Sequence, residues 1–176
     1  MRKIILALMS VVAMLTAVPA QAEVNLSVID MQRILSESLA AKDILAQMKT
    51  YREKLEKEVK KLDEVLKAEE KELIKKKETA KPEEFAAARK AFEKKLTEGR
   101  TTVQDKRKKA DAAFNKAIGT LRENILTVVS TLAAENKTQL VITKQNVVIG
   151  DKALEITDAV MTRLNDKIKS IKVTVE

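Results

Sequence analysis

The sequence contains no cysteine, no histidine and no tryptophan, and only one tyrosine and three phenylalanines. Without imidazole and thiolate groups, the chain lacks the commonest catalytic bases and nucleophiles and the two ligand types that zinc prefers. Its three glycines form no glycine-rich phosphate loop. We therefore expect a protein that is not an enzyme, with no cofactor and no metal, held together by packing rather than by disulfides.

A charged start and a short apolar run open the chain. Arg2 and Lys3 precede an uncharged stretch from Ile4 to Val18, and an A-x-A sequence ends at Ala22. This pattern is typical of a secretory signal peptide, so we predict that residues 1–22 are removed after Ala22 and that the mature protein is exported. An uncleaved anchor is the alternative, although the apolar run is short for a membrane span.

Two long helical patterns follow, and one proline separates them. The segment VNLSVID, residues 24–30, predicts a strand that leads into a helix with Asp30 as its N-cap. Apolar positions recur at coiled-coil spacing up to Leu73, which predicts one continuous helix from Asp30 to Glu78. Pro82 disfavours helical geometry at Lys81 and suits the first turn of a second helix, so we expect a hairpin tip near residues 79–82.

The second helical pattern matches the first when the chain folds back at this tip. The fold-back places Leu66 opposite Leu96 and Val59 opposite Val103, so that apolar residues meet. Several seam positions carry charge, which predicts a weak and bendable coiled coil. Gly99 marks either a close helix crossing or a flexible joint.

The last part of the chain has a different pattern. LVIT, residues 140–143, and NVVI, residues 146–149, predict short strands, and the spacing from Ile156 onwards predicts a helix with Thr157 as its cap. Residues 171–175 alternate and fit either a further strand or a frayed end. We predict an α+β fold: a small β-rich oligomerisation body, residues 23–41 plus 117–176, and a projecting antiparallel helical hairpin arm, residues 42–116.

The predicted body is too small to be stable alone. A sheet of two or three strands with open edges is marginal in water, so its strands should pair with other copies of the chain. The same apolar residues would also serve an intrachain core. The residues that we assign to oligomerisation are Leu26, Val28, Ile29, Leu140, Ile142, Val147 and Ile149.

The positive charge lies on the arm. Residues 42–116 carry a net charge of +7, while the rest of the mature chain carries −1. A solvated helix face with ion pairs four residues apart explains much of the lysine, and a negatively charged partner explains the excess. Export and the lack of stacking aromatics argue against nucleic acid. The candidate binding residues near the tip, which dipole capping alone would also explain, are Lys75, Lys76, Lys77, Lys81, Arg89, Lys90, Lys94 and Lys95.

The order of these elements, with the strings SVIDMQRILSES, LVITKQNVVI and LEITDAVMTRLNDKI, resembles the Skp/OmpH family of periplasmic chaperones. The resemblance covers residues 23–169. It implies a homotrimer in the periplasm whose helical arms surround a cavity and hold unfolded outer-membrane proteins without ATP. The family is also associated with lipopolysaccharide, so acidic lipid or lipopolysaccharide is a further candidate partner. A structural coiled-coil protein that bridges a folded partner in the envelope is the alternative.

Overall fold

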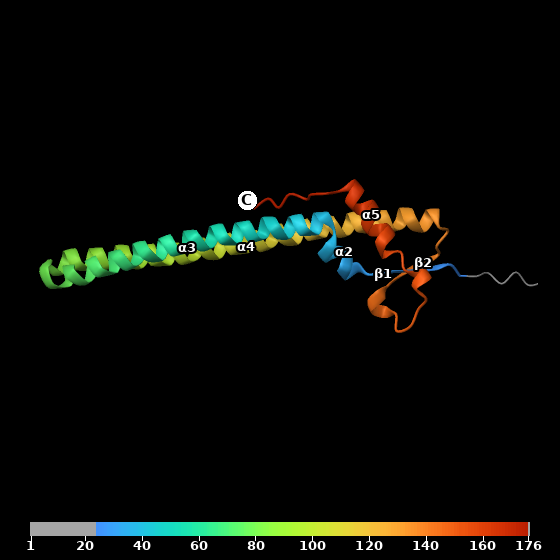
Figure 1. Ribbon diagram of the computed structural model, residues 1–176. Helices are drawn as coiled ribbons and strands as arrows, with labels where there is room; N and C mark the ends of the chain where they lie inside the picture. Colours follow the sequence, from blue (N-terminus) through green and yellow to red (C-terminus); the bar gives the residue numbers. More distant parts are fainter. Residues whose placement is uncertain (1–23, 176) are drawn as a thin grey trace, which may run out of the picture.

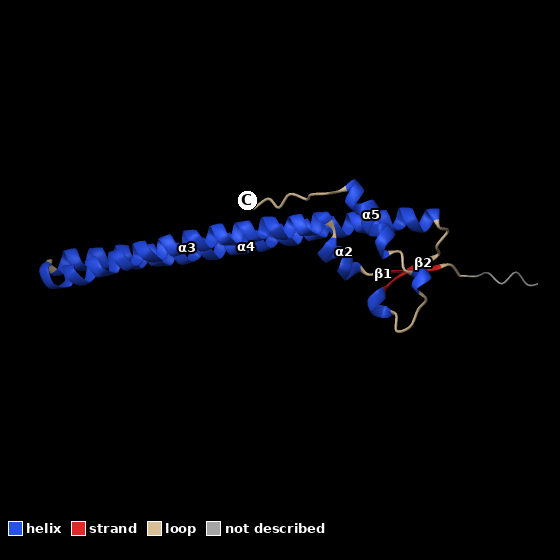
Figure 2. Ribbon diagram, viewed as in Figure 1, coloured by secondary structure: helices blue, strands red, loops and turns tan. Residues whose placement is uncertain are grey.

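The computed structural model describes residues 24–175, and the predicted signal peptide lies outside them. Two long helices, α3 (Leu39–Thr79) and α4 (Pro82–Glu135), lie side by side and extend away from a small group of elements at one end (Figures 1 and 2). A mostly helical protein with a small two-stranded sheet confirms the predicted α+β class. Within the described range, no helix combines the length and apolar character that a membrane span requires.

The remaining elements are short and gather at the end of the long helices where the sheet lies. They are, in chain order, β1 (Leu26–Ile29), α2 (Met31–Glu37), β2 (Leu140–Thr143), 3₁₀ turns at Lys144–Asn146 and Lys152–Leu154, and α5 (Thr157–Lys167).

The first helix begins where the sequence predicts, but it is not continuous. Asp30 caps α2, since its carboxylate accepts from the Arg33 N–H at 2.9 Å. Ser38 is extended, with ψ of 152°, and ends α2 while its hydroxyl accepts from the Ala41 N–H and so caps α3. The prediction of one helix from Asp30 to Glu78 is therefore wrong at Ser38. The buried hydroxyl replaces one of the helical bonds lost at the break, and α2 can then pack against α4 and α5.

The chain reverses between Thr79, the last residue of α3, and Pro82, the first residue of α4. Ala80 and Lys81 are both extended, and the Lys81 carbonyl accepts from the Phe85 N–H at 3.0 Å. Pro82 needs no donor at the first helical position, so it starts α4 at little cost.

Contacts between α3 and α4 continue along their length. The Tyr51 hydroxyl donates to the Lys106 carbonyl at 3.3 Å, and nearer the tip Leu62 packs against Gly99. Residues later in α3 thus meet residues earlier in α4, so the two helices run in opposite directions. At Gly99 a Cβ would lie 3.0 Å from Leu62 Cδ2, which supports the close-crossing interpretation of this glycine.

The sheet is parallel and has two strands. Leu26 lies opposite Leu140 and Val28 opposite Ile142. The other edge of β1 is partly covered, because the Val28 carbonyl accepts from the Ile156 N–H at 2.9 Å. Among the described residues, β2 pairs with no strand except β1, so its outer edge is open.

The predicted second strand of this region, residues 146–149, does not form. Residues 144–146 are a 3₁₀ turn, and Val148 and Ile149 are 97% and 93% exposed. A segment with no neighbouring strand has no ladder to join, so its β-branched composition alone does not make it a strand.

Helix α5 closes the base of the molecule with Val160 and Leu164, both fully buried. Ile156, rather than the predicted Thr157, is its N-cap. The Thr157 hydroxyl accepts instead from the Asp30 N–H at 2.9 Å and so ties the start of α5 to the end of β1. The cap prediction is wrong because a tertiary partner uses that hydroxyl.

Burial divides the long helices into two parts. No residue from 49 to 109 is buried, and we call this range the outer segment. We call residues 24–48 and 110–175 the base, which holds all of the buried core. The fully buried side chains Ile34, Ile44, Leu121 and Ile125 form the centre of that core.

Candidate binding surface on the outer segment

All eight predicted binding residues lie on the surface near the tip, and the fold brings them to the last turns of α3 and the first turns of α4. Half of them have an acidic partner. Lys75 pairs with Glu72 at 2.7 Å and Arg89 with Glu93 at 2.8 Å. The other two pairs are Lys94 with Glu98 and Lys95 with Glu69.

The other four predicted residues have no acidic group within 4.0 Å among residues 24–175; they are Lys76, Lys77, Lys81 and Lys90. Lys76 and Lys77 lie in the last turn of α3, where the helix dipole favours a cation. Glu83 and Glu84 occupy the first turn of α4, where it favours an anion. The tip therefore offers charges of both signs, with a small positive excess.

Ion pairs shift the pKa of two carboxylates on the outer segment. The hydrogen bond from Lys75 holds the pKa of Glu72 below its ordinary value. Further down, the hydrogen bond from Lys106 on α4 lowers the pKa of Glu58 on α3, and the same bond raises the pKa of Lys106. These groups are solvated, so they stay charged at neutral pH.

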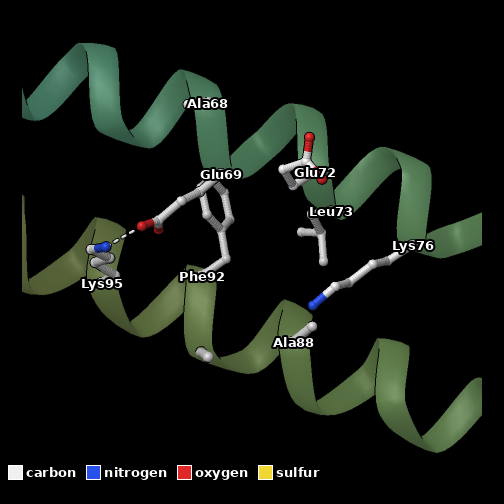
Figure 3. Close-up of a pocket in the computed structure, with 9 residues that line it drawn as sticks. Ala68, Glu69, Glu72, Leu73, Lys76, Ala88, Phe92 and Lys95 are labelled. Atoms are coloured by element: carbon white, nitrogen blue, oxygen red, sulfur yellow. Dashed lines mark hydrogen bonds and ion pairs between the residues drawn. The ribbon is translucent and has the colours of Figure 1, made fainter. Parts of the chain in front are cut away.

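A groove with an apolar floor lies between the helices just below the tip (Figure 3). Its volume is about 470 Å³, and Leu73 and Phe92 point into it from opposite helices. The ion pair of Glu69 with Lys95 and the Lys76 side chain form its rim. The remaining lining residues are Ala68, Glu72, Ala88 and Ala91.

Sequence reasoning did not find this groove. The heptad pattern placed Leu73 and Phe92 in the seam between the helices, where apolar side chains are expected to fill the space. The sequence feature that could have indicated the groove is the set of alanines at residues 86–88 and 91, because small side chains leave space in a helical seam. A second groove of about 270 Å³ continues from Leu73 and Phe92 to Phe85 and Ile74, which is 59% exposed.

The predicted oligomerisation residues occupy three different environments. Val28 and Ile29 on β1 are buried within this chain, and Leu26 is half-buried. On β2, Ile142 is half-buried and Leu140 is 50% exposed beside the open edge. Val147 and Ile149 belong to the loop rather than to a strand, and Ile149 is almost fully exposed.

No group of three or more metal-ligating side chains occurs among residues 24–175. What the outer segment offers chemically is a set of exposed ammonium and carboxylate groups around shallow apolar grooves. Such a surface can make many weak contacts with a partner.

Comparison with known proteins identifies the family. The sequence model of the family described as outer membrane protein (OmpH-like) matches residues 25–164, most of the chain. This chain belongs to that OmpH-like family. No curated protein matches it significantly.

A solved structure shares the fold of this OmpH-like chain. It is a crystal structure from Caulobacter crescentus, described as an OmpH-like outer membrane chaperone, with a TM-score of 0.81 and 22% sequence identity over 86% of this chain and 90% of that chain. At this level of identity the match shows that the two chains share a fold.

Proposed function

We propose that this protein is an ATP-independent periplasmic holdase that keeps unfolded outer-membrane proteins from aggregating and aids their delivery to the outer membrane. The observation that carries the proposal is the outer segment: residues 49–109 form a long helical pair with no buried residue. A pair that contributes so little to a core is free to contact something else.

The arm, residues 42–116, would hold clients by many weak contacts. The grooves at Leu73 and Phe92 can receive apolar side chains of a barrel precursor, and the surrounding charges keep each contact short-lived. Several such contacts together give useful affinity without fixing the client in a misfolded form. Client release needs no nucleotide, because insertion into lipid buries the same apolar surfaces.

Three copies would surround the client. The body, residues 23–41 and 117–176, carries the open edge of β2 with Leu140 beside it and the exposed Val148 and Ile149 nearby in sequence. An unpaired strand edge and exposed apolar residues favour pairing with another copy. The number three comes from the family resemblance, and sedimentation equilibrium at micromolar concentration tests it.

The basic arms have two further candidate partners, acidic lipid and lipopolysaccharide, since the charge excess attracts any anionic surface. A structural role, in which the helical pair bridges one folded partner, would require a firm complex with that partner and no preference for unfolded chains.

The decisive experiment dilutes a urea-unfolded outer-membrane protein into buffer with and without the mature protein and follows light scattering. We expect scattering to be suppressed at a several-fold excess of the proposed trimer. Scattering that is unchanged at that excess contradicts the holdase function. If the protein binds a folded partner as well as it binds the unfolded chain, the structural role is favoured.

A further inference from the structure

The C-terminal tail, residues 168–175, extends beyond the family match, which ends at Leu164. It leaves α5 and runs alongside α3 and α4 in an extended conformation (Figure 1). Ile171, Val173 and Val175 are half-buried, while Lys172 and Thr174 are exposed. The alternation is that of a strand with one covered face, although the surface beneath it is helical.

A single glutamine holds the backbone of this tail. Gln47 on α3 donates from Nε2 to the Ile171 carbonyl at 2.9 Å, and its Oε1 accepts from the Val173 N–H at 2.9 Å. The Ile171 carbonyl and the Val173 N–H lie on either side of Lys172. In a parallel ladder, a neighbouring strand likewise bonds to the carbonyl before one residue and to the N–H after it. The side-chain amide thus takes the place of a strand partner.

Asp43 fixes the orientation of that amide. Its Oδ2 accepts from Gln47 Nε2 at 2.7 Å and from the Ser170 hydroxyl at 2.7 Å. Because the amide binds only main-chain atoms of the tail, the contact does not depend on which side chains the bound segment carries.

The groove between the tail and α4 is positively charged. It has a volume of about 330 Å³, and Ala112, Ala113 and Ala117 form an apolar wall. Lys109, Lys116 and the tail's own Lys172 also line it, and no acidic residue does. Like charges around one groove weaken the hold on the tail, whereas a segment with an acidic residue in place of Lys172 would be favoured.

From these contacts we infer that the surface under the tail is a binding site for extended polypeptide segments with alternating apolar side chains and an acidic outward residue, and that the tail is its displaceable internal occupant. The identity of such a segment as an unfolded client rests on the proposed function. Barrel precursors consist of alternating segments of this kind.

A tethered occupant competes at an effective concentration of about millimolar, so it excludes weak ligands and yields to segments that also contact the arm. The tail would therefore raise the affinity that a segment needs in order to bind at this site. A short isolated segment would bind poorly while the tail is seated.

The test uses a fluorescein-labelled synthetic peptide with two copies of the sequence of residues 170–176, in which glutamate replaces lysine. Its binding is followed by fluorescence anisotropy against the mature protein and against a variant that ends at Lys169. We expect the shortened variant to bind the peptide about five-fold more tightly, because its internal competitor is gone. Gln47→Ala in the shortened variant should remove most of that gain.

A pair of full-length variants tests the same inference in the opposite direction. Lys172→Glu should seat the tail more firmly beside Lys109 and Lys116 and weaken peptide binding about three-fold at low salt. Lys169→Glu makes the same charge change outside the groove lining and should have less effect. Circular dichroism checks that all variants keep the helical content of the parent.

Equal peptide binding by the shortened and full-length chains, or equal effects of Lys172→Glu and Lys169→Glu, overturns the inference. The aggregation assay is separate. If the tail controls peptide binding but scattering is not suppressed, the groove stands and the holdase function fails.

Discussion

The base and the outer segment are built largely from the same two helices, yet they differ in what those helices do. In the base, α3 and α4 meet through fully buried residues such as Ile44 and Leu121, and α5 adds Leu164. In the outer segment, no residue is buried, and half-buried leucines alternate with ion pairs. One continuous helical pair thus separates stability, which lies at the base, from an accessible surface, which lies beyond it.

The largest difference should appear when one buried and one outer apolar residue are truncated. Ile125→Ala should lower the free energy of unfolding by about 3 kcal/mol, because it leaves a cavity in the core. Leu66→Ala should cost about 1 kcal/mol, since that side chain is half-exposed and water can fill the space. Urea unfolding followed by circular dichroism measures both, and equal losses would remove the distinction between the two regions.

Charge reversal at the tip should slow client capture more than charge reversal at exposed base positions away from the tail. Lys76→Glu combined with Lys77→Glu should slow client capture several-fold at low ionic strength, and added salt should reduce that effect. Lys137→Glu with Lys152→Glu is the control, because it makes the same change at exposed positions of the base. Stopped-flow fluorescence with a labelled unfolded client gives the rates. Equal slowing by the two variants would show that the tip has no special role.

The two helical glycines of α4 offer a finer comparison. Gly119→Ala should stabilise the protein by about 1 kcal/mol, since no atom lies within 4 Å of the new Cβ. Gly99→Ala should stabilise it less, because its Cβ meets Leu62 Cδ2 at 3.0 Å and Leu62 must move. Thermal unfolding ranks the two variants, and a larger gain for Gly99→Ala would mean that the helices are not closely packed there.

The smallest effect should come from the ion pairs. Because the pKa values of Glu58 and Glu72 are lowered in the folded state, their contribution to stability is present above the ordinary carboxyl pKa and is lost as the pH falls through the folded value. We expect a modest drop in melting temperature below about pH 4. Glu58→Gln should reduce that drop. If melting temperature depends on pH in the same way in this variant and in the parent, the ion pair of Glu58 with Lys106 contributes nothing measurable to stability.

Much of the helical architecture could be predicted because its signals are local. Pro82 has consequences for its own geometry and that of Lys81 only, and the helices end and begin beside it. Asp30 caps α2 through a contact three residues away. The break at Ser38 was missed because the stretch around it has neither glycine nor proline, and its cause is tertiary packing of α2.

The β region and the binding surface could be predicted less well. Residues 146–149 have strand composition, but strand formation depends on a partner that the single chain does not supply. The eight basic residues lie at the surface, and their role in binding stays a prediction. The grooves and the Gln47 contact depend on side chains from two or three elements meeting in space. No spacing within one helix encodes such a meeting.

Photo-cross-linking from matched alanines on α4 tests most directly whether clients contact the outer segment more than the base. Ala91 in the outer segment and Ala134 in the base are both exposed, and the chain has no cysteine, so each can be replaced by cysteine and labelled with benzophenone. With an unfolded outer-membrane protein, the label at Ala91 should cross-link strongly and the label at Ala134 weakly. Equal yields, or a higher yield from Ala134, would contradict the assignment of the main client-binding surface to the outer segment.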